Sequence, residues 1–513
     1  KSKSSSPSPS LQHTSAPVIS ADVTSHAVNE NDSMDYVWQY ISQQKENPSM
    51  STDSSNVRVA IRMRPLNQRE VDLHAQQCVD MFSGTDLMII DEETTMENKF
   101  SFDYCFDAKC LDSSQSFAGN QQQVFDKLGL EVLTNAWNGY NASLFAYGQT
   151  GSGKSYSMMG SDADPGIIPR VCMALFYLIQ RHYETVEGQI QAGSKAEPSD
   201  RHFSVEASYL EIYNERIRDL LDPSRANLKV REHPQTGVFV ENLSTCAVEN
   251  YKDVSDLLEM GLQQRTTAAT QMNSESSRSH SVFTIVIRMK SLLANGKQAV
   301  RLCKLCLVDL AGSERAASTG ATGARLKEGA NINRSLSTLG RCISALAKVA
   351  SAERDGEKIN IPFRESVLTW LLRESLCGNA KTAMLATVSP ADVNYGETLS
   401  TLRYANSAKM IATKAVVNED PTTKIINELR NEVMRLRDEL SGAGHSQGSS
   451  GSLSGSPVAQ SGGGAEEGMS SKKINEKMKE HLLMAENALQ TYAKAWESKE
   501  VCYHCIYIYL LVI

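Results

Sequence analysis

The stretch FAYGQTGSGKSYSMMG, residues 145–160, decides the fold class. It carries the complete phosphate-loop pattern, Gly148-x4-Gly153-Lys154-Ser155, at the end of the short apolar run ASLFAY. In such a loop, glycines let successive backbone N–H groups turn toward phosphates, and the N-terminus of the following helix adds a favourable dipole. The pattern assigns Lys154 to the β- and γ-phosphates and the Ser155 hydroxyl to Mg²⁺. It therefore predicts a nucleoside triphosphate site between a strand and a helix.

Strand-like and helix-like segments alternate on both sides of this loop. VRVAIRM at 57–63 alternates as a half-buried strand does, whereas LCKLCLVDL at 302–310 is mostly apolar, as a central strand would be. This alternation predicts an α/β fold in which helices cover both faces of a sheet. The other expected strands are 203–213 and 281–289, and the expected helices are 121–137, 166–184, 252–269, 329–349, 364–376 and 395–410.

The composition narrows the class of protein. With 41% hydrophobic and 22% charged residues, the chain has the balance of a soluble globular protein. Its net charge of −8 argues against general nucleic-acid binding, although a local basic patch is compatible with it. Eleven scattered cysteines indicate reduced thiols in a cytosolic compartment rather than a disulfide framework. We expect Cys303-x-x-Cys306 to be two buried strand cysteines rather than a redox pair or half a zinc site.

The segments outside residues 56–412 differ in composition from that central region. Residues 1–55 are rich in Ser, Pro, Asn and Gln and are predicted to be mostly disordered. The segment 421–441 predicts a helix of about two heptads, which either docks on the domain or pairs weakly with a second copy. Its apolar positions are Ile426, Leu429, Val433, Leu436 and Leu440. Beyond it we expect a Gly/Ser linker at 442–471, an amphipathic helix at 472–500 and an apolar tail at 501–513, which is shorter than the ~20 residues that cross a bilayer.

Two further segments add chemistry to the phosphate loop. NSESSRSH at 273–280 is rich in hydroxyl groups and precedes a strand, so it can hydrogen-bond a γ-phosphate and release it after hydrolysis. DLAGSE at 309–314 ends an apolar strand, where Asp309 can hold the Mg²⁺ shell and Gly312 can bring its N–H to the γ-phosphate. Two loops that respond to the γ-phosphate predict a switch between ordered and released states.

These three segments together resemble the phosphate loop, switch I and switch II of a kinesin motor domain. FAYGQTGSGKS, NSESSRSH and DLAGSERAASTGATGARLKEGANINRSLSTLG occur in kinesin order and spacing, and the resemblance covers about residues 56–415. It implies a P-loop NTPase fold with a central mixed sheet flanked by helices on both faces, followed by a short neck coiled coil. It also implies a microtubule-stimulated ATPase that uses ATP and Mg²⁺.

The resemblance assigns roles to individual residues. Arg62, Pro65 and Tyr156 match positions that flank the adenine, and Ser277 matches the switch I serine near Mg²⁺, which Ser155 and Asp309 also hold. Arg278 and Glu314 match the pair that closes the switches and orders the attacking water. The implied catalytic residues are Lys154, Ser277, Arg278, Asp309, Gly312 and Glu314, and the implied phosphate-loop contacts are Gly148, Gln149, Thr150, Gly151, Ser152, Gly153, Lys154 and Ser155.

The resemblance also implies a microtubule face, formed by the helix at 329–349, the loop after it and the segment 361–379. Between Lys327 and Lys381 the chain has nine Lys or Arg and six Asp or Glu, a net +3 that suits acidic tubulin. The expected contacts are Lys327, Arg334, Arg364 and Arg373.

The C-terminal part resembles the kinesin-3 group. VNEDP, the short heptad segment and INEKMKEHLLMAENALQTYAKAWESKE carry this resemblance. It implies a motor domain at 56–412, a neck linker at 413–420, plus-end-directed movement and cargo binding through regions that this chain does not contain. A monomer or a weak neck-coil homodimer on cytoplasmic microtubules is expected. Many kinesin-3 motors carry a run of lysines in the loop before the IPFRES segment. In this chain that loop, KVASAERDGEKIN at 348–360, is nearly neutral, which predicts a weak tether to tubulin's acidic tails.

Two other functions remain open from the sequence. One is a nucleotide-gated microtubule-binding protein that turns over too slowly to move, against which the intact Ser277, Arg278, Asp309 and Glu314 count. The other is a GTPase-like switch, which lacks a base-specific NKxD motif after the switch segments.

Overall fold

The computed structural model describes the predicted domain and one stretch before it. The described residues are 34–45, 55–91, 93–110, 115, 118–191, 201–233, 237–272, 276–292, 298–314, 324–351, 359–418 and 435. The predicted helix at 421–441, apart from Arg435, the linker at 442–471, the helix at 472–500 and the tail at 501–513 lie outside them. None of the helices in these described ranges combines the length and the apolar character that a membrane span requires.

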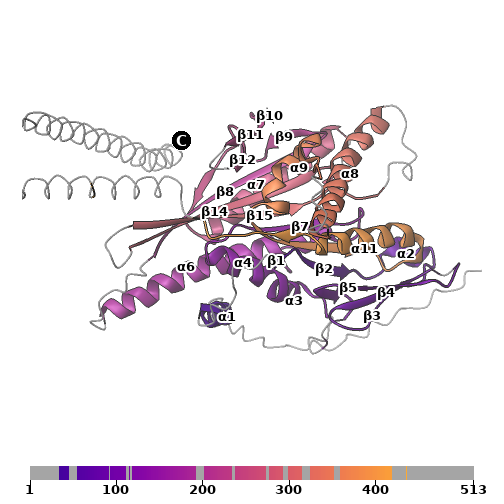
Figure 1. Cartoon of the computed structure of the whole chain (residues 1–513), viewed down its shortest axis with the longest axis horizontal. Helices are drawn as coiled ribbons and strands as arrows, with labels where there is room; N and C mark the ends of the chain where they lie inside the picture. Colours follow the sequence, from indigo (N-terminus) through magenta and orange to yellow (C-terminus); the bar gives the residue numbers. More distant parts are fainter. Residues whose placement is uncertain are drawn as a thin grey trace, which may run out of the picture.

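The centre of the molecule is a ten-stranded mixed sheet (Figure 1). Its strand order is β10-β9-β8-β14-β15-β7-β16-β2-β6, with β13 paired to β8. β15, β7, β16, β2 and β6 run parallel, whereas β8, β9, β10, β13, β14 and β15 pair antiparallel. The bounds are β2 Arg58–Met63, β6 Tyr104–Asp107, β7 Ala142–Tyr147, β8 Arg201–Tyr213, β9 Arg216–Asp219, β10 Ala226–Leu228, β13 Cys246–Val248, β14 His280–Leu292, β15 Gln298–Asp309 and β16 Lys381–Val388.

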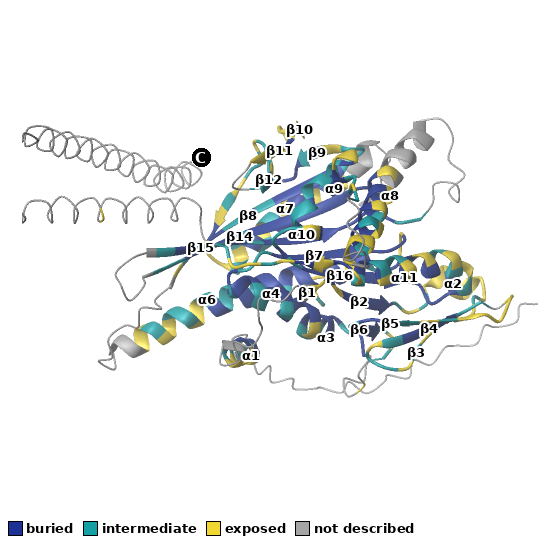
Figure 2. Cartoon of the chain, viewed as in Figure 1, coloured by how far each residue is buried: buried dark blue, intermediate teal, exposed yellow. Residues whose placement is uncertain are grey.

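Helices cover both faces of this sheet, as the sequence predicts. All six residues of β7 are buried because alternate side chains enter two different cores. Leu144, with Ala142 and Ala146, lies in the core that includes α4, α6 and α7, whereas Phe145 lies in the core that includes α8, α9 and α11. Figure 2 shows the buried strands between the two helical layers. The bounds are α4 Leu130–Trp137, α6 Ile167–Gln191, α7 Tyr251–Met272, α8 Ala324–Ser351, α9 Val367–Leu371 and α11 Tyr395–Lys409.

Two of the expected helices are interrupted. The segment 121–137 is α3 (Gln121–Val124), a π-helical turn (Phe125–Gly129) and α4, and the segment 364–376 divides into α9 and α10 (Arg373–Cys377) at Leu372. α5 (Lys154–Met158) and α2 (Gln68–Asp72) are short helices beside the glycine loop and β2. Small satellite sheets add β3 Val79–Met81, β4 Asp86–Ile90, β5 Glu97–Ser101, β11 Val230–His233, β12 Gly237–Val240, β1 Ser55–Asn56 and β17 Ala412–Thr413.

The cysteine prediction is confirmed. Cys303 and Cys306 are both buried free cysteines on β15, and they pack into different cores. Burial raises the pKa of both thiols. In the part of the chain with assigned structure, no group of three or more His, Cys, Asp or Glu side chains could hold a metal ion.

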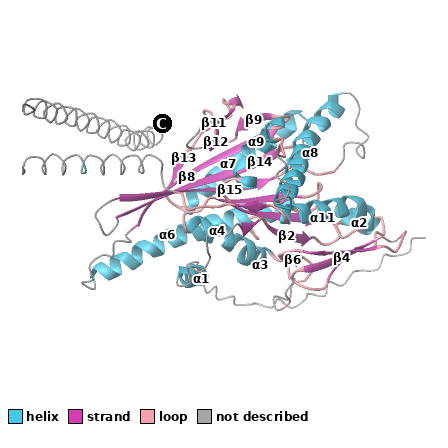
Figure 3. Ribbon diagram, in the orientation of Figure 1, coloured by secondary structure: helices cyan, strands magenta, loops and turns pink. Residues whose placement is uncertain are grey.

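The prediction of disorder is wrong for residues 35–45, which form the helix α1 (Asp35–Lys45). Val37 and Ile41 are buried in the core that includes α4 and α6, and Figure 3 shows α1 as a separate short helix below these two. Their spacing of four residues was the available signal, because it places both side chains on one helix face. The polar composition of the surrounding segment outweighed it.

Candidate active site

The glycine loop joins the end of β7 to the start of α5. Gly148, Gly151 and Gly153 all have positive φ, at 151°, 75° and 104°, a conformation that favours glycine. A Cβ on Gly148 would also lie 2.3 Å from the Thr387 carbonyl oxygen, so the loop passes directly over β16. Gly153 precedes the first residue of the helix, Lys154. The strand, loop and helix therefore follow in the order that a phosphate cradle needs.

Lys154 is a buried cation inside this loop. Its side chain donates from Nζ to the carbonyl oxygens of Gly148 and Gln149, at 2.8 and 2.9 Å. Burial lowers the pKa of Lys154, while the carboxylates of Asp309 and Glu314 oppose that shift. Ser152 fixes the loop by donating to the Gln149 carbonyl at 2.8 Å. A charge held in this way, in surroundings that screen it poorly, attracts an anion strongly.

Ser155 and Asp309 meet at the position assigned to the metal. The Ser155 hydroxyl donates to Asp309 Oδ2 at 2.6 Å, and the Arg265 guanidinium lies 3.9 Å from the same oxygen. Asp309 Oδ1 is buried and has no hydrogen-bond partner within the described part of the chain. A hydroxyl beside a buried carboxylate oxygen that lacks a partner fits Mg²⁺, which prefers oxygen ligands and is held by few carboxylates together with phosphate and water.

The two predicted switch segments contact each other through their backbones. Ser277 and Arg278 lie in a 3₁₀ turn, Ser276–Arg278, and the Ser277 carbonyl accepts from the Gly312 N–H at 2.8 Å. The Ser313 N–H donates to the Gly148 carbonyl at 3.1 Å. Glu314 accepts from the Thr150 N–H at 2.8 Å and from the Thr150 hydroxyl at 2.5 Å. The structure therefore joins the DLAGSE segment to the phosphate loop and the 273–280 segment to DLAGSE, while the pairing of Arg278 with Glu314 stays a prediction.

His280, which the sequence reasoning did not select, joins both switches to α8. Its Nδ1 accepts from the Ala311 N–H at 2.9 Å, so the neutral ring carries its proton on Nε2 and donates to Ser335 Oγ at 2.7 Å. Burial, with Lys154 and Arg265 adding to it, lowers the pKa of His280 to about 3. The residue ends the SSRSH motif at the first position of β14, which was the signal that could have found it.

Arg62 and Tyr156, which were predicted to flank the adenine, lie against each other. The Arg62 guanidinium carbon is 5.3 Å from the centre of the Tyr156 ring, and Tyr156 is 48% exposed. Arg62 itself is buried, and it donates to Gln121 Oε1, Ser157 Oγ and the Gly119 carbonyl at 2.8–2.9 Å. Burial lowers its pKa to about 10.

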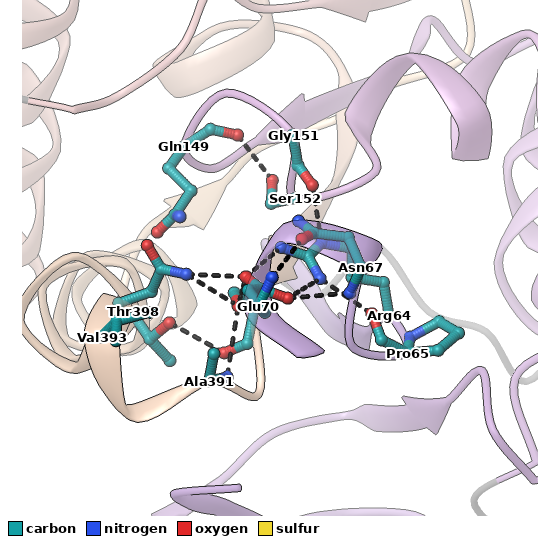
Figure 4. A network of polar contacts seen from close by, with 12 residues as sticks. Arg64, Pro65, Asn67, Glu70, Gln149, Gly151, Ser152, Ala391, Val393 and Thr398 are labelled. Carbon is teal, nitrogen blue, oxygen red and sulfur yellow. Dashed lines mark hydrogen bonds and ion pairs between the residues drawn. The ribbon is translucent and has the colours of Figure 1, made fainter. Parts of the chain in front are cut away.

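Pro65 belongs to a network that ties the RMRP segment to the phosphate loop (Figure 4). Arg64 donates to the carbonyls of Pro65 and Gly151, at 2.8 and 2.6 Å, and forms a two-pronged ion pair with Glu70. Burial alone would raise the pKa of Glu70, but hydrogen bonds from Arg64, the Asn67 N–H and Ser389 lower it to about 2. The sequence reasoning missed Arg64 and Glu70, although the capping-box pair Asn67–Glu70 is a local signal.

The predicted microtubule contacts lie in the helical layer that contains α8, but their side chains have different surroundings. Arg334 is exposed on α8, while the side chain of Lys327 lies outside the described residues. Arg364 and Arg373 both bind Glu232 of β11, at 2.8 and 2.7 Å. Their hydrogen bonds lower the pKa of Glu232. Two of the predicted contacts therefore share one carboxylate, which β11 supplies.

The described part of the predicted linker, 413–418, lies along the domain. β17 pairs with β1, and the Val416 N–H donates to Asn379 Oδ1 at 2.5 Å. Asn418 donates from its N–H to the Gly139 carbonyl at 3.1 Å and accepts from the Leu302 N–H at 3.2 Å. Asn379 also donates to the Asn418 side chain. The linker thus rests on residues next to β7 and β16.

Comparisons with known proteins agree with this geometry. The family model of the kinesin motor domain matches residues 62–411. The chain is 51% identical to human kinesin-like protein KIF13B over 401 residues and 50% identical to kinesin-like protein unc-104 of Caenorhabditis elegans over 402. Each match covers 76% of this chain but only 21% and 24% of the relative, so the chain spans about a quarter of their length or less.

Solved structures give the same result. A KIF14 dimer with AMP-PNP in complex with a microtubule is 44% identical, with a TM-score of 0.62, covering 74% of this chain and all of that one. A structure described as that of a fast kinesin is 39% identical, with a TM-score of 0.61, covering 72% of this chain and 96% of that one.

Proposed function

Because the chain belongs to the kinesin motor domain family and resembles its kinesin-3 group, we propose that it hydrolyses ATP on microtubules and moves toward their plus ends. The observation that carries this proposal is a continuous path of contacts from the phosphate loop to α8. Glu314 contacts Thr150, Gly312 contacts Ser277, and His280 links Ala311 to Ser335 on α8. A change at the phosphates can therefore reach the helix proposed to bind the microtubule.

In this proposal the loop residues bind and orient the substrate. Lys154 exchanges the carbonyls of Gly148 and Gln149 for phosphate oxygens, and the loop N–H groups line the phosphates. Ser155 and Asp309, with the predicted ligand Ser277, would hold Mg²⁺, which when bound would neutralise charge that develops on the phosphates. Positioning and charge stabilisation of this kind account for most of the catalysis of phosphoryl transfer.

The switch residues would then order the attacking water. Gly312 exchanges the Ser277 carbonyl for the γ-phosphate, which draws the DLAGSE segment inward. Arg278 and Glu314 pair as the switches close, so that the water is held in line with the phosphorus only when the substrate is present. The movement passes through His280 to α8 and ends in docking of the linker, whose described residues already lie along Asn379 and Gly139.

We further propose that the protein works in the cytoplasm on the microtubule cytoskeleton and carries cargo. It would act as a monomer or as a weak dimer through the neck segment at 421–441. Arg334, Arg364 and Arg373, together with Lys327, would contact tubulin through the modest positive charge of that face.

The test is the steady-state ATPase rate of the full chain with and without microtubules. We expect the rate to rise by orders of magnitude on microtubules, and Arg278→Ala to abolish that rise while leaving the fold intact. A flat rate with nucleotide-dependent microtubule binding would refute the motor and favour a nucleotide-gated tether. A preference for GTP over ATP would instead favour a GTPase-like switch.

A further inference from the structure

Helix α1 lies outside the family match, which begins at residue 62, yet it is attached to the domain. Val37 and Ile41 are 0% and 2% exposed against the core around α6. Asp35 accepts a hydrogen bond from Tyr177 of α6 and lies 3.8 Å from Arg181. A helix of 11 residues is marginal on its own in water, so these contacts are what hold it in place.

Tyr36 of α1 begins a chain of hydrogen bonds that leads into the domain. Its hydroxyl donates to Asp126 Oδ1 at 3.0 Å and accepts from Gln122 Nε2 at 2.8 Å. Gln122 Nε2 also donates to Asp126, while Gln122 Oε1 accepts from the Arg170 guanidinium. The amide of Gln122 is therefore oriented, because its nitrogen faces two oxygens and its oxygen faces a cation.

The series of hydrogen bonds continues from Arg170 to Tyr156, the residue that follows the phosphate loop. Arg170 donates to Asp164 Oδ1 at 3.1 Å and to the Pro165 carbonyl at 2.8 Å. Asp164 Oδ2 accepts from the Tyr156 hydroxyl at 3.0 Å. The Tyr156 ring in turn lies against Arg62. The series of hydrogen bonds that starts on α1 thus ends at Tyr156, whose aromatic ring is predicted to flank the adenine.

A second connection runs through the neighbouring glutamine. Gln121 donates from Nε2 to the Tyr156 carbonyl at 2.7 Å and accepts from Arg62 at Oε1. Gln121 and Gln122 are consecutive residues in the single turn of α3, so a shift of that turn moves the direct partner of Tyr156, Gln121, together with the residue that binds Arg170. α1 contacts this turn through Tyr36.

We propose that α1 is a positioning element for the adenine end of the nucleotide site, which it controls through Tyr36, Gln122, Arg170 and Asp164. This inference rests on the proposed function, because it takes the nucleotide to bind at the loop 148–155. When α1 leaves α6, Gln122 and Arg170 lose a restraint, the Tyr156 ring is less fixed and the purine binds more weakly. The phosphates are unaffected, because Lys154 and Ser155 take no part in this chain. Tyr36 and Arg170 also line a groove of about 1190 Å³.

The first experiment removes a single hydroxyl group in the full chain. Tyr36→Phe is compared with Tyr40→Phe, which makes the same change on the same helix, beside Glu131, at a similar exposure of 38% against 36%. The measurements are the dissociation constant of MgADP and the inhibition constant of magnesium tripolyphosphate, which has no base. We expect Tyr36→Phe to raise the dissociation constant of MgADP by about threefold to tenfold, which corresponds to the loss of one or two hydrogen bonds. The inhibition constant of tripolyphosphate should stay within about twofold of its original value. Tyr40→Phe should change neither constant.

The second experiment undocks the helix. Ile41→Asp places a charge on the buried face, and Gln39→Asp places the same charge on the exposed face. We expect only Ile41→Asp to weaken the binding of MgADP, and to weaken it more than Tyr36→Phe does. Neither variant should change the binding of tripolyphosphate. Unchanged MgADP binding in both Tyr36→Phe and Ile41→Asp would overturn the proposal, and so would an equal loss of MgADP and tripolyphosphate binding. An unaltered chain that binds neither ligand would instead refute the nucleotide site itself, and this inference with it.

Discussion

Replacing His280 with glutamine should flatten the dependence of the unfolding free energy on pH. The His280 ring is buried among β14, the DLAGSE segment and α8, where it accepts from the Ala311 N–H and donates to Ser335. Its pKa falls from 6.5 to about 3, chiefly because burial disfavours the charged ring. Glutamine retains a donor and an acceptor but does not titrate, so it isolates the effect of the imidazole.

The sign and size of the effect follow from proton linkage. In the unfolded chain the imidazole titrates near pH 6.5, so below that pH the unfolded state binds a proton that the folded state excludes. The free energy of unfolding therefore falls as the pH falls. Between pH 7.5 and 5.5 the loss from this one group is about 1.4 kcal/mol, and any folded pKa below about 4.5 gives the same value.

The assay is urea unfolding of the full chain and of His280→Gln at pH 7.5 and 5.5, in one buffer. The chain has ten histidines, and the contribution of the other nine cancels when the two proteins are compared. Wild type should lose about 1.4 kcal/mol more than the variant over this interval. Parallel pH dependences would refute the reasoning, because they would mean that His280 takes up a proton in the folded state and does not sit in the buried arrangement described here.

Three further outcomes are expected from the site and the linker. Asp309→Asn should raise the Mg²⁺ concentration needed to retain nucleotide by about 10–100-fold, measured by release of a fluorescent ADP during titration with a chelator; an unchanged requirement would place the metal elsewhere. Asn379→Ala removes two side-chain hydrogen bonds to the linker, so it should shift docking by about 1–3 kcal/mol and slow microtubule gliding while basal ATP hydrolysis stays the same. Glu232→Gln removes the carboxylate that Arg364 and Arg373 share, so it should tighten microtubule binding at low salt and lose that effect at high salt; weaker binding at low salt would exclude β11 from the face.

The parts of the fold that follow from short-range pattern could be predicted from the sequence. The phosphate loop is determined by glycines at positions that adopt positive φ, and the apolar run before it is determined by burial on two faces. The proximity of Arg62 to Tyr156, 94 residues later in the chain, came from the family resemblance and not from any local pattern. The structure brings these two side chains together because β2 and β7 both flank β16.

The parts that depend on distant partners could not be predicted in this way. Glu232 contacts Arg364 across 132 positions of sequence, and nothing near either residue indicates the other. The net +3 of the predicted microtubule segment therefore overstates the free charge of that face, because the count leaves out a carboxylate supplied by β11. His280 shows the same limit, since its partners lie 31 and 55 positions away.

The contacts between the switches explain why a small change at the phosphates can move a helix. The Gly312 N–H is bound to the Ser277 carbonyl, and in the proposed mechanism it exchanges that carbonyl for a phosphate oxygen. A buried N–H must keep one acceptor, so the segment has two defined positions rather than a continuous range. Ala311, which immediately precedes Gly312, is bound to His280, and His280 is bound to Ser335 on α8. Because the ring is neutral, the movement passes through two hydrogen bonds that do not change with protonation of His280 in the cellular pH range. His280 should therefore add no pH dependence to the coupling between nucleotide and microtubule from pH 6 to 8.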